Sequence, residues 1–148
     1  MSLDLIKHYP VMMNEVLSFL SDNKTIVDCT FGGGGYSSSI LEKFNKSNVI
    51  GIDRDKNIIE YALKVKKNYN KRFSFHNIKF SQIHQLEHFN NSDFFIFDLG
   101  LSNFQLKNMK RGFSFESNST LDMTMGLNSF NAYAVSYTHL RAHETLPY

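Results

Sequence analysis

Apolar residues along this chain gather in short runs that alternate with stretches of helical spacing. Three nearly continuous apolar runs, 25–29, 48–53 and 93–98, predict buried parallel strands, because a strand covered on both faces needs no polar alternation. The segment 72–76 alternates phenylalanines with polar residues and predicts a further strand. These segments are expected to pair in one sheet.

Segments with helical spacing separate the strands. Apolar positions recur at this spacing in 11–21, 37–44 and 56–68, and Asp55 is placed to cap the last of these helices. A short helix or turn is expected over 80–89. Strands alternating with helices predict an α/β fold with a doubly wound parallel sheet, which binds ligands at the carboxyl ends of its strands.

Four consecutive glycines, 32–35, lie between the first strand and the helix that follows it. Glycine permits positive φ and lets a ligand approach the backbone closely, and the helix start offers free N–H groups. This layout of strand, glycine loop and helix is typical of sites for nucleotide-like ligands. A flexible surface linker is the alternative, and the flanking strand and helix patterns argue against it.

Acidic residues refine the ligand class. Asp53 ends the second strand about twenty residues after the loop, where a carboxylate suits a ribose diol. This position alone does not separate a nicotinamide dinucleotide from S-adenosylmethionine. Ser37 stands where the dinucleotide pattern has its third glycine, and Asp28 precedes the glycines as in methyltransferase loops. The pattern therefore favours S-adenosylmethionine; a helix cap remains the alternative role for Asp53.

Composition and charge limit the possible size, partners and location of the protein. A length of 148 residues fits one domain or part of one, and a net charge of +2 permits a nucleic-acid partner without arguing for it. The single cysteine excludes an internal disulfide and suits a reducing compartment. No signal peptide and no apolar run of membrane-spanning length is apparent, so a cytoplasmic location and no membrane association are expected.

The pattern changes in the last third of the chain. Residues 99–126 show little periodicity, and 110–115 mix cations with aromatic side chains, which is typical of a functional loop or of a solvated one. Residues 135–148 hold no Lys, Asn, Ile or Phe, and their string VSYTHLRAHET resembles the translation of a sequencing adapter. We interpret 135–148 as a non-native tail, with a native polar tail as the alternative, and leave it out of the fold prediction.

Several short sequence motifs, called family words below, together resemble those of a known family over residues 7 to about 134. The words are His8-Tyr9-Pro10-Val11, Asp28 through Tyr36, Ile52-Asp53-Arg54-Asp55, Phe80-Ser81, Asp98-Leu99-Gly100-Leu101-Ser102, Gln105-Leu106, Arg111-Gly112-Phe113-Ser114-Phe115 and Leu121-Asp122-Met123. The chain resembles the MraW-type family of bacterial methyltransferases, which modify the exocyclic N4 of a cytidine in small-subunit (16S) ribosomal RNA. The resemblance implies a Rossmann-like class I methyltransferase fold, here an N-terminal fragment over 1–134 that is truncated after about the fourth strand and inactive by itself.

The resemblance also implies a site for S-adenosylmethionine. In it, Gly34, Gly35 and Tyr36 face the methionine and ribose parts, Asp53 binds the ribose, Phe80 lines the adenine pocket, and Asp98 and Gln105 complete the methyl side. The chain departs from the family at some positions: Tyr36 replaces a usual His, Gly33 a usual Arg, Asn103-Phe104 a common Ser-Pro, and Thr124 and Gly126 a common Arg and Asp. These departures affect local contacts with cofactor or RNA.

The implied reaction is a direct displacement of a methyl group from sulfonium to nitrogen. It needs no covalent intermediate, so Cys29 is interpreted as a core residue. Asp98 is the candidate catalytic residue, accepting hydrogens from the cytosine amine; a purely cofactor-binding role is the alternative. The aromatic residues Phe104, Phe113 and Phe115 are expected either to stack on a flipped base or to form core, and Arg111 either to contact phosphate or to be solvated.

The expected partner is 16S ribosomal RNA in the small ribosomal subunit, with a homodimer of the full-length protein as a further possibility. The histidines show no metal-ligand spacing, and no metal site is predicted. Three alternatives stay open: an amine methyltransferase acting on another RNA or DNA, a nucleotide-binding module without catalysis, and a nicotinamide-dependent oxidoreductase.

Overall fold

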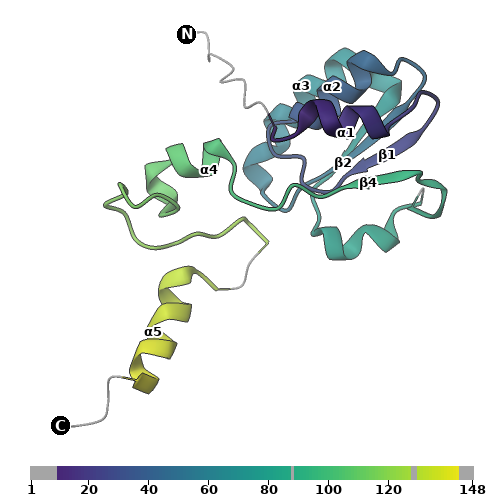
Figure 1. The fold of residues 1–148 in the computed structure, drawn as a ribbon. Helices are drawn as coiled ribbons and strands as arrows, with labels where there is room; N and C mark the ends of the chain where they lie inside the picture. The colour runs from purple at the N-terminus through teal and green to yellow at the C-terminus, as the bar shows by residue number, and fades with distance from the viewer. Residues whose placement is uncertain (1–9, 88, 128–129, 144–148) are drawn as a thin grey trace. The chain divides into compact units, whose positions relative to one another are not determined.

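The computed structural model describes residues 10–87, 89–127 and 130–143 (Figure 1). The chain divides into two compact units, Met1–Gly100 and Leu101–Tyr148. His8 and Tyr9 of the first family word and the last five residues of the tail, 144–148, lie outside the described residues.

A parallel sheet forms the centre of the first unit. Its strands are β1 (Thr25–Asp28), β2 (Asn48–Ile52), β3 (Phe73–His76) and β4 (Phe94–Ile96), in the order β3-β2-β1-β4. This confirms the four predicted strands and the parallel α/β sheet. The chain steps outward from β1 to β3 and then returns to the other side of β1 with β4. The point where the order reverses is where such sheets bind ligands.

One helix precedes the first strand, and further helices fill the connections between the strands. They are α1 (Met13–Phe19), α2 (Gly35–Lys43), the 3-10 turn η1 (Lys56–Ile58) leading into α3 (Ile59–Tyr69), and the 3-10 segments η2 (Asn70–Arg72), η3 (Phe80–Gln85) and η4 (Phe89–Asn91). The predicted helices are confirmed, with changed ends. The first is shorter than 11–21, and the second begins earlier, at Gly35, because Gly34 supplies its left-handed N-cap at φ 76°. Asp55 caps η1 as expected, accepting a hydrogen bond from Asn57 N at 3.1 Å.

Both faces of the sheet are covered. Val27, Cys29, Ile50 and Ile52 form a buried cluster on one face. Partly buried side chains of the connection from β3 to β4 pack against this cluster, namely Ile78, Ile83 and Leu86. Cys29 is 2% exposed, which confirms it as a core residue. The opposite face lies against α2, where Ile40 and Leu41 are fully buried. Side chains that point alternately to the two faces therefore hold the strands in place on both sides. The carboxyl ends of these strands form the candidate site described below.

The second unit holds α4 (Asn103–Lys107), the 3-10 turn η5 (Met109–Arg111) and α5 (Ala132–His143). The low periodicity of 99–126 did not predict α4, so this segment is less irregular than the sequence indicated. A capping box explains α4: Ser102 Oγ accepts from Gln105 N, and Gln105 Oε1 accepts from Ser102 N at 2.9 Å. The predicted tail boundary at 134 falls inside α5.

A close backbone crossing holds the loop after η5. Gly112 lies at φ 68°, and a Cβ on it would come within 2.7 Å of the Thr120 carbonyl oxygen. Met123 N donates to Arg111 O at 2.8 Å across the same crossing. The RGFSF and LDM words thus meet in space. Among the described residues, no helix combines the length and the apolar character needed to cross a membrane.

Candidate functional site

The glycine loop is a packed turn fixed to the sheet. Gly32 and Gly34 both have positive φ, at 53° and 76°. Phe31 lies buried beneath the loop; its N–H donates to Ile52 O, and its ring packs 5.6 Å from that of Phe73. A Cβ on Gly34 would come within 2.7 Å of the Phe31 ring. The loop is therefore a packed turn of defined shape, and the linker alternative is wrong.

Asp53 ties this loop to the end of β2. Its Oδ2 accepts from Gly32 N and its Oδ1 from Asp55 N, both at 2.8 Å. The Asp53 carbonyl oxygen accepts from Asn77 Nδ2 at 2.7 Å, which joins the residue after β3 to the same position. Partial burial raises the pKa of the Asp53 carboxyl group. Each carboxylate oxygen retains a second acceptor position, so two hydroxyl groups can still donate to Asp53.

Asp28 lies behind the loop and is completely buried. Its Oδ2 accepts a hydrogen bond from Ser37 Oγ at 2.7 Å, which fixes the first turn of α2 to the end of β1. Burial raises the pKa of Asp28 to about 6, and the hydrogen bond from Ser37 opposes this rise. Asp28 therefore shapes the loop from within the core.

The Tyr36 side chain is buried and bonds to the segment before α1. Its ring is 6% exposed, and its hydroxyl group donates to the Val11 carbonyl oxygen in the turn before α1. Burial raises the pKa of the Tyr36 hydroxyl group. The side chain therefore anchors the N-terminal segment to α2, while the backbone of Gly35 and Tyr36 forms the first turn of the helix. The expectation that Tyr36 faces a cofactor stays a prediction.

Asp98 follows β4 at the same edge of the sheet. Its N–H donates to Thr30 Oγ1 at 2.8 Å, and the preceding Ile96 carbonyl oxygen accepts from Cys29 N at 2.9 Å. These bonds fix the Asp98 backbone beside the start of the glycine loop, while the residue itself is exposed. The structure thus brings Asp53 and Asp98 to one edge on either side of β1.

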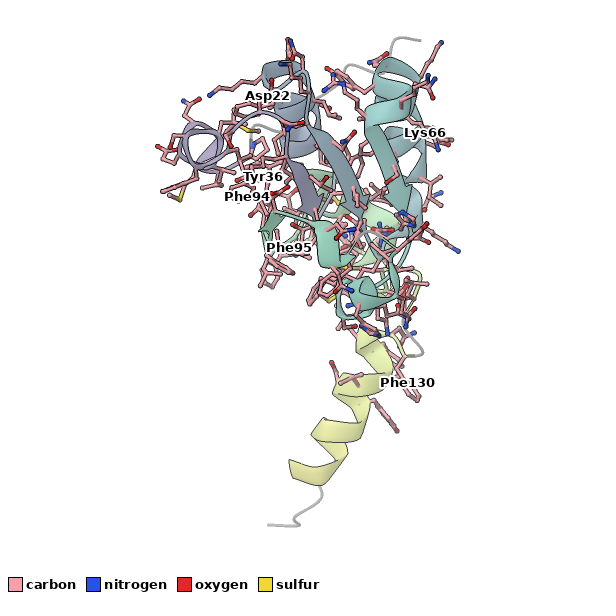
Figure 2. The ribbon with its side chains drawn as sticks, turned by 90° about the vertical axis from the view of Figure 1, so that its right-hand side faces the viewer. Asp22, Tyr36, Lys66, Phe94, Phe95 and Phe130 are labelled. Carbon is pink, nitrogen blue, oxygen red and sulfur yellow. The ribbon has the colours of Figure 1, made fainter. Side chains whose placement is uncertain are left out.

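Two phenylalanines lie at this edge and remain partly exposed. Phe80 begins η3 and is 43% exposed; Phe97 follows β4 and is 48% exposed. Their rings pack edge to face, with centroids 5.7 Å apart and an interplanar angle of 89°. Figure 2 labels Phe94 and Phe95 on β4, the strand that leads to Phe97. The sequence predicted Phe80 as a site residue, and this role stays a prediction.

Gln105 belongs to the second unit. It is 5% exposed, and its side chain serves the capping box of α4. The site residues of the first unit, in contrast, share one sheet edge; they are Gly34, Gly35, Tyr36, Asp53, Phe80 and Asp98. The role of Gln105 on the methyl side stays a prediction.

The aromatic residues of the second unit differ in burial. Phe113 is buried, and the Arg111 guanidinium lies 5.0 Å above its ring while donating to Thr124 O at 2.6 Å. Both residues therefore hold the loop together. Phe104 is half-buried and Phe115 is fully exposed, so Phe115 is the freest of the three candidate stacking residues. Among the described residues, no group of three His, Cys, Asp or Glu side chains is arranged to hold a metal ion.

Comparison with known proteins gives a consistent set of relatives. Residues 5–140 match the model of the MraW methylase family. A ribosomal RNA small subunit methyltransferase H from Brachyspira hyodysenteriae is 43% identical over 133 residues, covering 88% of this chain and 44% of that protein. Proteins of the same name from Rickettsia canadensis and Rickettsia prowazekii are 43% and 42% identical, each covering 84% of this chain and 41% of the relative. The chain spans less than half the length of these curated relatives.

Proposed function

This chain belongs to the MraW methylase family, and on that premise we propose that it binds S-adenosylmethionine at the carboxyl edge of its sheet. We propose further that, together with further polypeptide, it transfers the methyl group of this cofactor to the exocyclic N4 of a cytidine in small-subunit (16S) ribosomal RNA, in the cytoplasm. The observation that carries the proposal is the position of Asp53, hydrogen-bonded to the glycine loop at Gly32 N beside the reversal of strand order. A methylase family argues against the nicotinamide-dependent alternative.

The residues of the first unit fit the parts of this cofactor. Asp53 offers its remaining acceptor positions to the ribose hydroxyl groups. Gly35, which is partly exposed, begins α2 and brings the N-terminus of this helix to the loop, and Phe80 offers an exposed ring to the base. When bound, the sulfonium group supplies an electrophilic methyl group.

Asp98 is the residue we propose to act on the amine. The lone pair of the cytosine amino group is delocalised into the ring, so an acceptor for its hydrogens localises the pair on nitrogen. Asp98 presents an exposed carboxylate whose backbone is fixed by Thr30, as this role requires. A purely cofactor-binding Asp98 is the alternative.

Calorimetric titration with S-adenosylmethionine tests the cofactor site. We expect Asp53→Ala to weaken binding about 10- to 100-fold, the loss of a charge-assisted hydrogen bond pair. Asp53→Asn keeps one acceptor oxygen and should fall between this variant and the wild type. Asp93→Ala is the matched control, because Asp93 also accepts a backbone N–H, from Thr25, but precedes β4 at the opposite edge of the sheet.

Each outcome of this titration leads to a different conclusion. No binding by the wild-type chain overturns the cofactor assignment. Binding that Asp53→Ala leaves unchanged removes Asp53 from the site, and equal losses for Asp53→Ala and Asp93→Ala indicate that the effect comes from stability alone.

A further inference from the structure

We propose that Phe97 forms, together with Phe80, an aromatic wall for the adenine base of the cofactor. This inference rests on the proposed function and assigns a residue to the site that the family words do not include. It predicts that Phe97 contributes to affinity through the base and not through the ribose or methionine parts.

The two rings differ in exposure from the aromatic pair in the core. Phe31 and Phe73 also pack ring to ring, at 5.6 Å, but both are 3% exposed. Phe80 and Phe97 keep 43% and 48% of their surfaces exposed despite their contact at 5.7 Å. An edge-to-face pair that stays half uncovered has apolar surface left for a third flat group.

The backbone on both sides of this pair is tied to the site. Phe97 lies between Ile96 and Asp98, which bond to the end of β1 and to Thr30 at the start of the glycine loop. Phe80 follows Asn77, whose side chain donates to the carbonyl oxygen of Asp53. The exposed rings are thus anchored next to the acid that we assign to the ribose.

The chemistry of the ligand suits this position. Adenine is joined directly to the ribose and presents a flat π-face that stacks on aromatic side chains. A base attached to a ribose held by Asp53 has to lie close to that residue, and Phe80 and Phe97 are two exposed phenylalanines whose neighbouring residues bond to Asp53 and to the glycine loop.

A matched control lies two residues earlier in the chain. Phe95 lies in β4 itself, is 39% exposed, and packs 5.5 Å from Phe89 in an aromatic pair of its own. Phe97 directly follows the last residue of β4, so Phe95 lies farther from the carboxyl end of this strand. A general packing role predicts equal effects at the two positions, whereas a base-binding role predicts an effect at Phe97 alone.

The test compares Phe97→Leu and Phe95→Leu by calorimetry and ligand-observed NMR with S-adenosylhomocysteine. Leucine retains apolar volume, so both variants keep a packed side chain; Phe97→Tyr, which keeps the ring, should restore binding. We expect Phe97→Leu to raise the Kd about tenfold and to cut the saturation transferred to adenine H2 and H8 relative to the homocysteine protons. Phe95→Leu should change neither.

The outcomes distinguish this inference from the function on which it rests. If the wild type binds and Asp53→Ala weakens binding, but Phe97→Leu leaves the Kd and the adenine signal unchanged, Phe97 is not part of the site. The same conclusion follows if Phe95→Leu and Phe97→Leu have equal effects. If the wild type binds no S-adenosylhomocysteine, the proposed function fails together with this inference.

Discussion

Three aspartates close three parallel strands, and burial gives each a different character. Asp28 is completely buried behind the glycine loop, Asp53 is half-buried with both oxygens bonded to backbone N–H groups, and Asp98 is exposed. A buried carboxylate suits a scaffold, a bonded one with spare acceptor positions suits a hydroxyl ligand, and an exposed one suits contact with substrate.

The buried state of Asp28 predicts a pH-dependent stability. Its pKa of about 6 lies above the ordinary value of 3.8, so the folded state binds more protons between these values than the unfolded state does. The Asp28 contribution to stability is therefore present in full below about pH 4 and is lost as the pH rises through about 6. Asp28→Asn should remove this loss and increase the free energy of unfolding at pH 8 by at most about 3 kcal/mol.

Urea denaturation of the wild type and of Asp28→Asn between pH 4 and pH 8 measures this difference. The gap between the two free energies of unfolding should widen as the pH rises and level off above about pH 6. A gap that is constant across the range would contradict the raised pKa.

At the scale of elements, the ends of helices are secured by residues distant in sequence. Arg72, in η2, donates from Nη2 to Leu41 O and from Nη1 to Phe44 O, both at 2.9 Å, and from Nη1 to Ser47 O at 3.3 Å. These carbonyl groups lie in and beyond the last turn of α2, where backbone acceptors lack helical partners. A guanidinium group satisfies several of them and complements the helix dipole.

Removal of this cap should destabilise the first unit. We expect Arg72→Ala to lower the free energy of unfolding by about 1–3 kcal/mol, measured by urea denaturation. Arg72→Lys should cost less, since the ammonium group keeps the charge but cannot span three carbonyl groups. Lys71→Ala, at the exposed neighbouring position of η2, is the control and should change stability by less than about 0.5 kcal/mol. Equal effects of Arg72→Ala and Lys71→Ala would exclude a capping role.

At the scale of the whole molecule, the sheet and the relatives bear on where transfer activity resides. Of the strands that the structure describes, only β1 pairs with β4, and Phe95 on this strand is 39% exposed. The chain covers 44% of its Brachyspira relative. Strand β4 is therefore an outer strand of the sheet, and an outer strand with exposed phenylalanines favours pairing with further polypeptide. We therefore propose that transfer to RNA needs more polypeptide than these 148 residues.

A methyl-transfer assay tests this. Tritiated S-adenosylmethionine is incubated with small-subunit RNA that lacks the modification, once with the 148-residue chain and once with a chain extended by the part of the Brachyspira relative that it does not cover. We expect incorporation with the extended chain alone, at the N4 of a cytidine when the RNA is digested and analysed by mass spectrometry. Equal turnover by both chains would show that the shorter one carries the complete activity.

Local patterns predicted the elements of the first unit well. Apolar runs, alternation and a cap at Asp55 are properties of neighbouring residues, so the four strands, their helices and the glycine loop could be placed before the structure was known. The capping box that begins α4 was equally local, with Ser102 and Gln105 three positions apart, and it was missed because the surrounding residues lack periodicity.

Tertiary structure decided what depends on distant residues meeting. The strand order β3-β2-β1-β4, the cap on α2 by Arg72 and the bond from Tyr36 to Val11 all join positions more than twenty residues apart. Burial separated Asp28 from Asp98, although both simply follow apolar runs in the sequence. The pairing of Phe97 with Phe80 likewise exists only because the β3–β4 connection folds back along the sheet. Such contacts depend on the packing of the whole sheet and on the solvent it excludes, and no window of neighbouring residues contains that information.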